Sequence, residues 1–98
     1  MSLSSIYPFR YGKAVTEHDT NQITNFDGNK FFARGIWAIT TAGIVYVRIK
    51  GRREDPDDDL DTATNLVPVY LALGSVAIIE FDLVRSTGLT AAGLVIGW

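Results

Sequence analysis

The sequence predicts an all-β domain, a small antiparallel β-sandwich or barrel that we expect to be jelly-roll-like. Short apolar and β-branched runs alternate with turn-forming residues, most clearly from Leu66 to Trp98. No stretch shows the apolar period of roughly 3.6 residues that is typical of a helix. The 98 residues fit a single domain, and their 47% hydrophobic content is typical of a folded chain.

The first third of the chain is expected to be mostly loop. In residues 1–12, Ser, Pro and Gly separate isolated aromatic residues, which predicts an extended N-terminal arm. Lys13 to Thr16 is expected to be a short strand. The polar residues from Glu17 to Lys30 predict a loop with a turn at Asp27-Gly28.

Two central strands are predicted at Phe31–Thr40 and Ile44–Lys50, joined into a hairpin by the short link Thr41-Ala42-Gly43. Gly35 in the first strand indicates a bulge or a close backbone approach. In the second strand, alternation places the apolar side chains on one face. The opposite face then carries Tyr46, Arg48 and Lys50.

A long charged loop, Gly51 to Asn65, precedes two further strands separated by a turn at Gly74-Ser75. The first of these strands has an apolar face formed by Val67, Val69, Leu71 and Leu73. The second has a core face formed by Ala77, Ile79, Phe81 and Leu83, and its opposite face carries Glu80 and Asp82. Turn-rich residues 86–93 then lead to a last strand, Leu94 to Trp98.

Charge and composition exclude several classes of protein. The formal net charge of −2 provides neither the basic patch of a nucleic-acid-binding protein nor the field that draws a protein to an anionic membrane. Cysteine is absent, which excludes thiolate zinc sites and favours assembly in the cytosol. The N-terminus does not resemble a signal peptide, and the longest apolar run, Leu66 to Ile79, is too short for a membrane helix. We therefore expect neither nucleic acid nor a membrane among the partners.

The single histidine, His18, lies in a polar loop beside Glu17 and Asp19. A functional interpretation makes it a general base or a metal ligand, but both roles need partners placed by the fold. The chain has no serine in a nucleophile elbow and no second histidine. We therefore expect a solvated loop histidine.

The charged loop holds a run of carboxylates: Glu54, Asp55, Asp57, Asp58, Asp59 and Asp61. Clustered carboxylates are typical of calcium sites, but this run lacks the glycine and the final glutamate of an EF-hand loop. Arg52 and Arg53 precede the run and neutralise part of it. We favour a solubilising loop whose charges prevent edge-to-edge strand pairing, with a bound cation as the alternative.

Two other groups of residues allow a functional interpretation. Glu80 and Asp82 form a carboxylate pair of the type that glycosidases use, but their spacing on one strand favours a solvated face or an ion pair with a neighbouring subunit. The aromatic residues on strand patterns are interpreted as core or interface anchors rather than as a sugar-stacking platform. These are Trp37, Tyr46, Tyr70 and Trp98. The sequence therefore predicts no catalytic residue, no metal site and no cofactor.

Three short motifs occur in order along the chain: AVTEHDT at residues 14–20, TTAG at 40–43 and TGLTAAGLVIGW at 87–98. With these motifs the chain resembles the small head spike base family of tailed phages and gene-transfer-agent particles, over residues 14–49 and 65–98. Three positions depart from the family pattern. Ala77-Ile78-Ile79 stands where the family has a Leu-Pro pair, Leu83 replaces an arginine, and the charged segment from Arg52 to Asp61 looks like an insertion.

The resemblance implies a virion structural protein that is not an enzyme. Such a protein would be a homo-oligomeric base or decoration protein on the phage capsid surface, assembled in the host cytoplasm, that anchors a head spike or head fibre. Its partners would be the capsid protein and the spike or fibre protein, with a pentamer favoured over a trimer. Residues 1–12 would tie each copy to its neighbour. A carbohydrate-binding β-sandwich module that uses exposed aromatic residues is the alternative.

Overall fold

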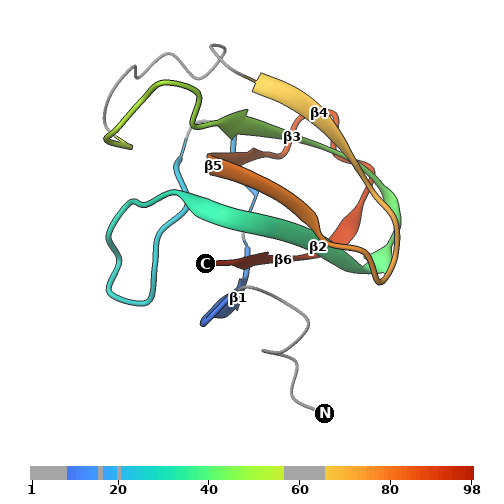
Figure 1. Ribbon diagram of the computed structural model, residues 1–98. Coiled ribbons are helices and arrows are strands. Elements are labelled where there is room, and N and C mark those ends of the chain that lie inside the picture. The colour runs from blue at the N-terminus through green and yellow to red at the C-terminus, as the bar shows by residue number, and fades with distance from the viewer. Residues whose placement is uncertain (1–8, 16, 20, 57–65) are drawn as a thin grey trace.

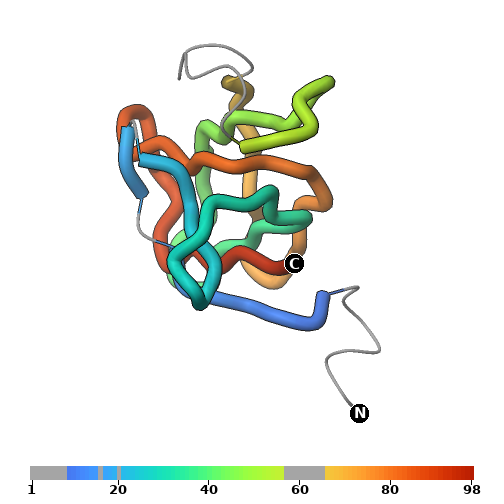
Figure 2. The backbone as a smooth tube through the Cα atoms, turned by 90° about the vertical axis from the view of Figure 1, so that its left-hand side faces the viewer, coloured from blue at the N-terminus to red at the C-terminus, as the bar shows by residue number. Residues whose placement is uncertain are grey.

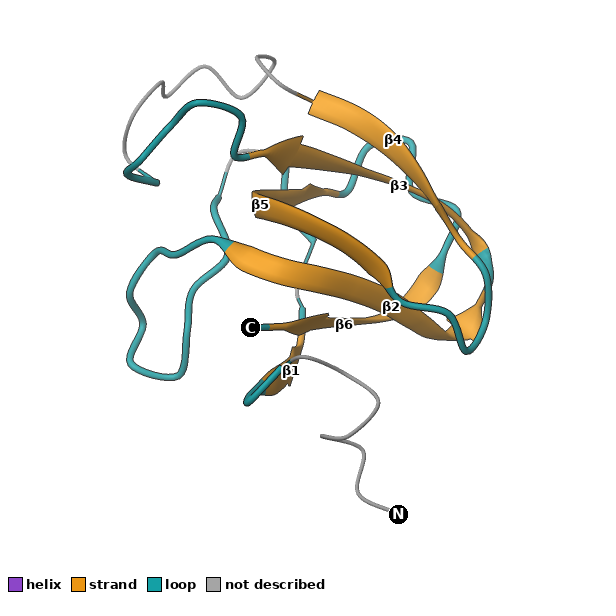
Figure 3. Ribbon diagram, in the orientation of Figure 1, coloured by secondary structure: helices purple, strands orange, loops and turns teal. Residues whose placement is uncertain are grey.

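The computed structural model of the chain (Figure 1) describes residues 9–15, 17–19, 21–56 and 66–98. These residues form strands and loops without a helix (Figure 3), so the described chain has no helical segment that could cross a membrane. The strands are β1 (Gly12–Ala14), β2 (Ala33–Thr41), β3 (Gly43–Ile49), β4 (Leu66–Leu71), β5 (Ala77–Arg85) and β6 (Ala92–Gly97). The predicted all-β class is confirmed.

All six strands belong to one antiparallel sheet with the order β1-β6-β2-β5-β3-β4. Figure 1 shows β4 and β3 at the top, β5 across the middle, and β2, β6 and β1 below. Within the described residues, β1 and β4 are the two edges of the sheet. Pro68 lies in β4, where an edge position suits a residue that cannot donate a ladder hydrogen bond.

The predicted hairpin of Phe31–Thr40 with Ile44–Lys50 is wrong. These segments form β2 and β3, which do not pair with each other, because β5 lies between them and pairs with both. A hairpin requires its two strands to run in opposite directions. Here β2 and β3 are both antiparallel to β5, so the single residue between them, Ala42, carries the chain across a fold in the sheet.

The sheet closes on itself beside this link. Thr41 at the end of β2 pairs with Ala92 of β6, and the backbone N–H of Thr90 donates to the carbonyl oxygen of Ile44 in β3 over 2.9 Å. The connection from β5 to β6 therefore contacts β3 while the start of β6 pairs with the end of β2, and the two halves of the sheet curl towards each other (Figure 1). This confirms the predicted small β-sandwich or barrel, while a jelly-roll-like arrangement stays a prediction.

The core fills the space inside the curled sheet. Its central members are Ile36, Ala38, Val45, Val47, Leu71, Phe81, Leu94 and Ile96, all of them buried. A strap of residues 15–23, of which 16 and 20 lie outside the described part, crosses one open side and adds the buried Ile23. Backbone N–H groups of the strap donate to β6 and β5, in the pairs Val15–Leu94, His18–Val84 and Ile23–Asp82.

Residues 9–12 of the predicted arm lie on the domain's own sheet, and residues 1–8 lie outside the described residues. The backbone N–H groups of Arg10 and Tyr11 both donate to the carbonyl oxygen of Trp98, and the Trp98 N–H donates back to Tyr11. Figure 2 shows this segment running close to the C-terminus. The C-terminal part of the predicted arm is therefore an element of the fold.

The ring of Phe9 covers two glycines, Gly35 and Gly97, that pair across β2 and β6. A Cβ atom at either position would overlap this ring. The close approach predicted at Gly35 is confirmed, and the register also shifts between Ala33 and Gly35.

The other strand predictions match the structure to within about two residues. The turn expected at Gly74-Ser75 is present, with a left-handed Gly74. The prediction that Leu73 lies on an apolar strand face is wrong, because β4 ends at Leu71 and Leu73 is 54% exposed. Of the charged loop, residues 57–65 lie outside the described residues.

Candidate functional site

A buried ionic cluster centres on Asp82 of β5. Arg48 of β3 donates to its carboxylate from Nε (3.1 Å) and from Nη2 (2.8 Å). Arg53, which follows β3, donates from both Nη atoms at 2.9 Å. Gln22 of the strap adds a bond of 2.8 Å from Nε2. Each carboxylate oxygen therefore accepts at least two hydrogen bonds.

These bonds determine the charge state of Asp82. Burial by itself raises the pKa of Asp82, but hydrogen bonds from Arg53, Arg48 and Gln22 outweigh burial and hold this pKa below its ordinary value. Arg53 is anchored further, since its Nη2 donates to the carbonyl oxygen of Ile49 over 2.7 Å. With both oxygens occupied by protein donors, the Asp82 carboxylate stabilises the fold and is not available to a substrate.

The sequence placed Arg48 and Asp82 on the strand faces opposite the core side chains and favoured a solvated face for Asp82, but both residues are buried. The register between β3 and β5 shifts at Arg48/Ile49, so Asp82 is an extra residue of β5 at this point. In addition, the strap and the turn after β3 supply Gln22 and Arg53, which cover Asp82. Glu80 differs from Asp82: its side chain is 56% exposed and lies 3.9 Å from the Lys50 ammonium, as expected for a solvated face.

A second carboxylate, Asp19, fastens the strap to the connection after β5. It accepts hydrogen bonds from the Ser86 hydroxyl (2.9 Å), the Thr87 N–H (2.8 Å) and the Thr87 hydroxyl (2.6 Å). Arg85 lies 3.8 Å away. The bonds from Thr87 are the main reason that the pKa of Asp19 falls to about 2.

The side of β1, β6, β2 and β5 that points away from the core forms an apolar surface, which we call the outer face. Its apolar strand positions are Gly12, Ala14, Gly35, Trp37, Ile39, Ile78, Val95 and Gly97, which adjoin through the strand register. Two exposed charged residues of the same strands, Arg34 of β2 and Glu80 of β5, border this apolar surface beside Gly35 and Ile78. Ile39 and Ile78 are each 67% exposed. Large exposed apolar side chains on one face are typical of an interaction surface.

The two tryptophans are covered by other aromatic rings. Trp37 stacks with Phe9 at a centroid distance of 5.8 Å. Trp98 contacts three rings at 4.6–5.7 Å: Tyr11, Phe26 and Phe31. This agrees with their interpretation as packing anchors. Of the other two aromatic candidates, Tyr46 packs beside Gly88 and is half-buried, and Tyr70 is exposed.

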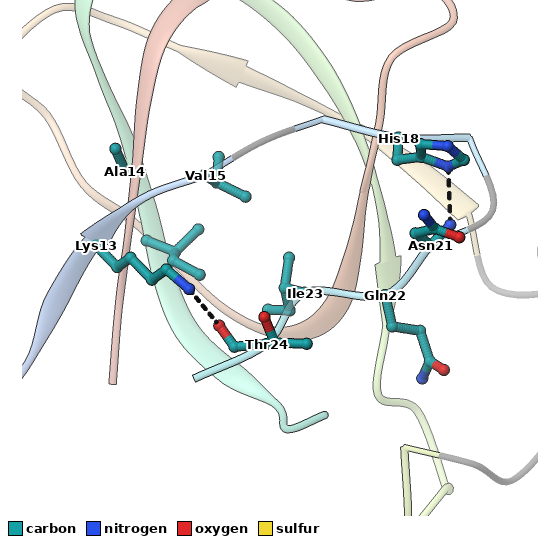
Figure 4. Close-up of a pocket in the computed structure, with 9 residues that line it drawn as sticks. Lys13, Ala14, Val15, His18, Asn21, Gln22, Ile23 and Thr24 are labelled. Carbon is teal, nitrogen blue, oxygen red and sulfur yellow. Dashed lines mark hydrogen bonds between the residues drawn. The ribbon is translucent and has the colours of Figure 1, made fainter. Parts of the chain in front are cut away.

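A pocket of about 200 Å³ lies in the bend that the chain makes from β1 through the strap (Figure 4). The described residues that line it are Lys13, Ala14, Val15, His18, Asn21, Gln22, Ile23, Thr24 and Ile96. Figure 4 shows the segments 13–15 and 21–24 facing each other across it. The Lys13 ammonium donates to the carbonyl oxygen of Thr24 over 3.2 Å, and Nδ1 of His18 accepts from the Asn21 N–H over 3.0 Å.

Among the described residues, the structure does not bring His18 and the carboxylates of the charged loop together into one site. His18 is exposed at one end of the pocket, and its Nδ1 is occupied. Glu54 and Asp55 are exposed, while Asp57, Asp58, Asp59 and Asp61 lie outside the described residues. Within the described part of the chain, no group of three or more His, Asp or Glu side chains is placed to hold a metal ion.

Sequence reasoning missed the pocket, because nothing in a polar loop indicates that it folds back on β1. Ala14, Val15 and His18, which line this bend, belong to the motif AVTEHDT, but from the sequence this motif indicated only a family resemblance. The outer face was also missed, since it depends on which strands become neighbours. Its one local signal was the run of uncharged residues in and around β6.

Comparison with models of known protein families, with curated proteins and with solved structures finds no match to this chain. The resemblance to the head spike base family therefore stays a prediction that rests on the three motifs.

Proposed function

We propose that this protein is a structural protein, not an enzyme, that assembles with further copies of itself through the outer face. The main observation behind the proposal is that this face joins apolar positions of four strands and leaves Ile39 and Ile78 largely in contact with water. Burying such a side chain fully contributes about 1.5–3 kcal/mol, so an assembly that covers both residues gains appreciably.

A second copy of the chain is the partner that fits this surface. The centre of a protein interface is depleted in charged residues, and the apolar strand positions of the outer face meet this condition on both sides when two copies meet. The Phe9 ring fills the space above Gly35 and Gly97, so that aromatic surface is continuous with Trp37. Aromatic residues of this kind are enriched at protein interfaces.

The polar groups support a structural role. Asp82 and Asp19 are the carboxylates with the most hydrogen bonds in the described chain, and protein donors take up these bonds. Both carboxylates join elements distant in sequence, Asp82 by linking β5 to the strap and to the turn after β3. Groups saturated in this way stabilise a fold rather than react with a substrate.

The motif resemblance suggests where the assembly works. In this proposal the chain forms a homo-oligomeric base or decoration protein on a phage capsid, most simply a pentamer, and holds a head spike or head fibre. The capsid protein and the spike or fibre protein are its further partners, and the virion surface is its location.

The test compares charged variants of the outer face with a matched control. We expect the double variant Ile39→Lys, Ile78→Lys to shift the oligomer towards the monomer in sedimentation velocity, because each new ammonium would have to be buried. Leu73→Lys is the control, since Leu73 is also exposed but lies beyond β4, off the outer face. The control should sediment as the unchanged protein does.

Two outcomes would contradict the proposal. One is an oligomer that survives both lysines with unchanged affinity. The other is equal dissociation by the Leu73→Lys control, which would show a general effect of charge. Circular dichroism of each variant establishes that the sheet is intact.

No specific observation favours the carbohydrate-binding alternative as a second proposal. Sugar-binding platforms need exposed aromatic faces, and in this chain the rings of Trp37 and Trp98 pack against other aromatic rings. Tyr70 is exposed, but no other aromatic ring of the described chain is in contact with it to extend a stacking platform.

A further inference from the structure

We propose that the pocket between β1 and the strap binds a carboxylate carried on a short apolar chain, with the Lys13 ammonium as its anchor. The site lies on the inner side of β1 and β6, since Lys13 pairs with the buried Ile96. It is therefore distinct from the outer face and does not rest on the proposed assembly.

The charge of Lys13 is the first argument. Its ammonium is part-buried and has two protein contacts, the carbonyl oxygens of Thr24 at 3.2 Å and Asn25 at 3.5 Å. Among the described residues, no carboxylate lies within ion-pair distance of it. Carbonyl oxygens supply only partial charge, so a part-buried ammonium held in this way favours an anion in the adjoining space.

The side chains that line the pocket indicate the chemistry of the rest of the ligand. The Thr24 hydroxyl and the Asn21 side-chain amide form no hydrogen bond with any other described residue, so both are available to a ligand. Apolar side chains, Val15, Ile23 and Ile96, complete the wall. A carboxylate at the ammonium and the hydroxyl can therefore extend an aliphatic chain over this wall.

The charge and size of the pocket narrow the ligand class. Lys13 is the only Lys or Arg among the described residues that line the pocket. One positive charge matches a monoanionic carboxylate better than a phosphate. The volume of about 200 Å³ is below that of pockets for drug-sized molecules, roughly 300–1,000 Å³, so the ligand has only a few non-hydrogen atoms.

Two sources provide this chemistry: a free short-chain carboxylate, or a glutamate side chain on a partner protein. The probe for the first is butyrate, and its neutral control is butyramide. The full chain, labelled with ¹⁵N, is titrated while the backbone amides of Lys13 to Thr24 are followed by NMR. We expect butyrate to shift these amides with a dissociation constant of about 1–10 mM, and butyramide to have at least ten-fold weaker affinity.

Variants test the role of Lys13. Lys13→Met keeps the length of the side chain and removes its charge, and it should weaken butyrate binding at least ten-fold. Lys30→Met is the matched control, because Lys30 is exposed and does not line the pocket, and its affinity should stay the same. If Lys13→Met does not fold, Thr24→Val replaces it, and a three-fold or greater loss of affinity is expected.

A second titration separates the two sources. A short peptide with one internal glutamate, capped at both ends, is compared with its glutamine counterpart. Binding of the glutamate peptide at least ten-fold tighter than butyrate supports a partner's side chain, and the reverse order supports a free carboxylate.

The proposal is overturned if neither probe shifts the pocket amides at 100 mM, if butyramide binds as well as butyrate, or if affinity survives the loss of the Lys13 charge.

Discussion

At the residue scale, Asp82 holds two arginines from different parts of the chain in one buried cluster. Replacing it with asparagine keeps its shape and removes the charge that balances them. Breaking a buried ion pair from one side costs about 3–5 kcal/mol, because the remaining charge stays buried without a partner. We expect Asp82→Asn to lower the free energy of unfolding in urea by about this amount.

Glu80→Gln is the control for this measurement. Glu80 is two residues away on the same strand, but its side chain is exposed, and its contact with Lys50 is 3.9 Å long. Such a surface pair contributes no more than about 1 kcal/mol. If Asp82→Asn were as mild as Glu80→Gln, the ionic cluster would not be a major source of the stability of the fold.

The ionisation of Asp19 makes the stability of the fold depend on pH. Its pKa is lowered to about 2 in the folded chain, chiefly by the Thr87 hydroxyl, so the carboxylate stabilises the fold above its ordinary pKa. This stabilisation is lost as the pH falls from about 4 to about 2. We expect the carboxyl ¹³C signal of Asp19 to titrate near 2, and Thr87→Val to raise the midpoint by removing the hydroxyl. Thr87→Ser restores a hydroxyl and should lower it again; a midpoint that ignores both changes would refute the assigned cause.

At the scale of elements, the sequence located the strands well and their partners poorly. Alternation of apolar residues is local, so it indicated β3 and the first half of β5 correctly. Which strands become neighbours depends on contacts distant in sequence, and the hairpin prediction at Ala42 failed for that reason. The burial of Arg48 and Asp82 was not predicted, because a register shift and two covering segments lie outside any local pattern.

The contact of Phe9 with Gly35 holds the N-terminal segment on the sheet. A Cβ at position 35 overlaps the Phe9 ring, so we expect Gly35→Ala to cost about 1–3 kcal/mol of stability. In the background Phe9→Ala the same substitution should cost much less, because the overlap is gone.

A double-mutant cycle in urea measures this coupling. Gly12→Ala is the control on the same face, where the nearest atoms lie at an ordinary 3.7 Å from the added Cβ, and it should change stability by less than about 0.5 kcal/mol. Additive effects of Gly35→Ala and Phe9→Ala would show that the N-terminal segment does not rest on the glycine pair.

At the scale of the whole molecule, the closed sheet has two surfaces with different uses. The inner side carries the core and the pocket, and the outer face carries exposed apolar residues. Composition indicated that the chain folds, but it contained no sign of the outer face, whose members come from four strands. The candidate site could therefore not be predicted until the strand order was known.

The mass of the full chain in solution, measured by native mass spectrometry over a range of concentrations, tests the central claim of self-assembly most directly. We expect a closed oligomer, most simply a pentamer of about 54 kDa from five copies of the 10.8 kDa chain. A single species of 10.8 kDa at every concentration up to about 100 μM, a range in which weak assemblies still form, would contradict it.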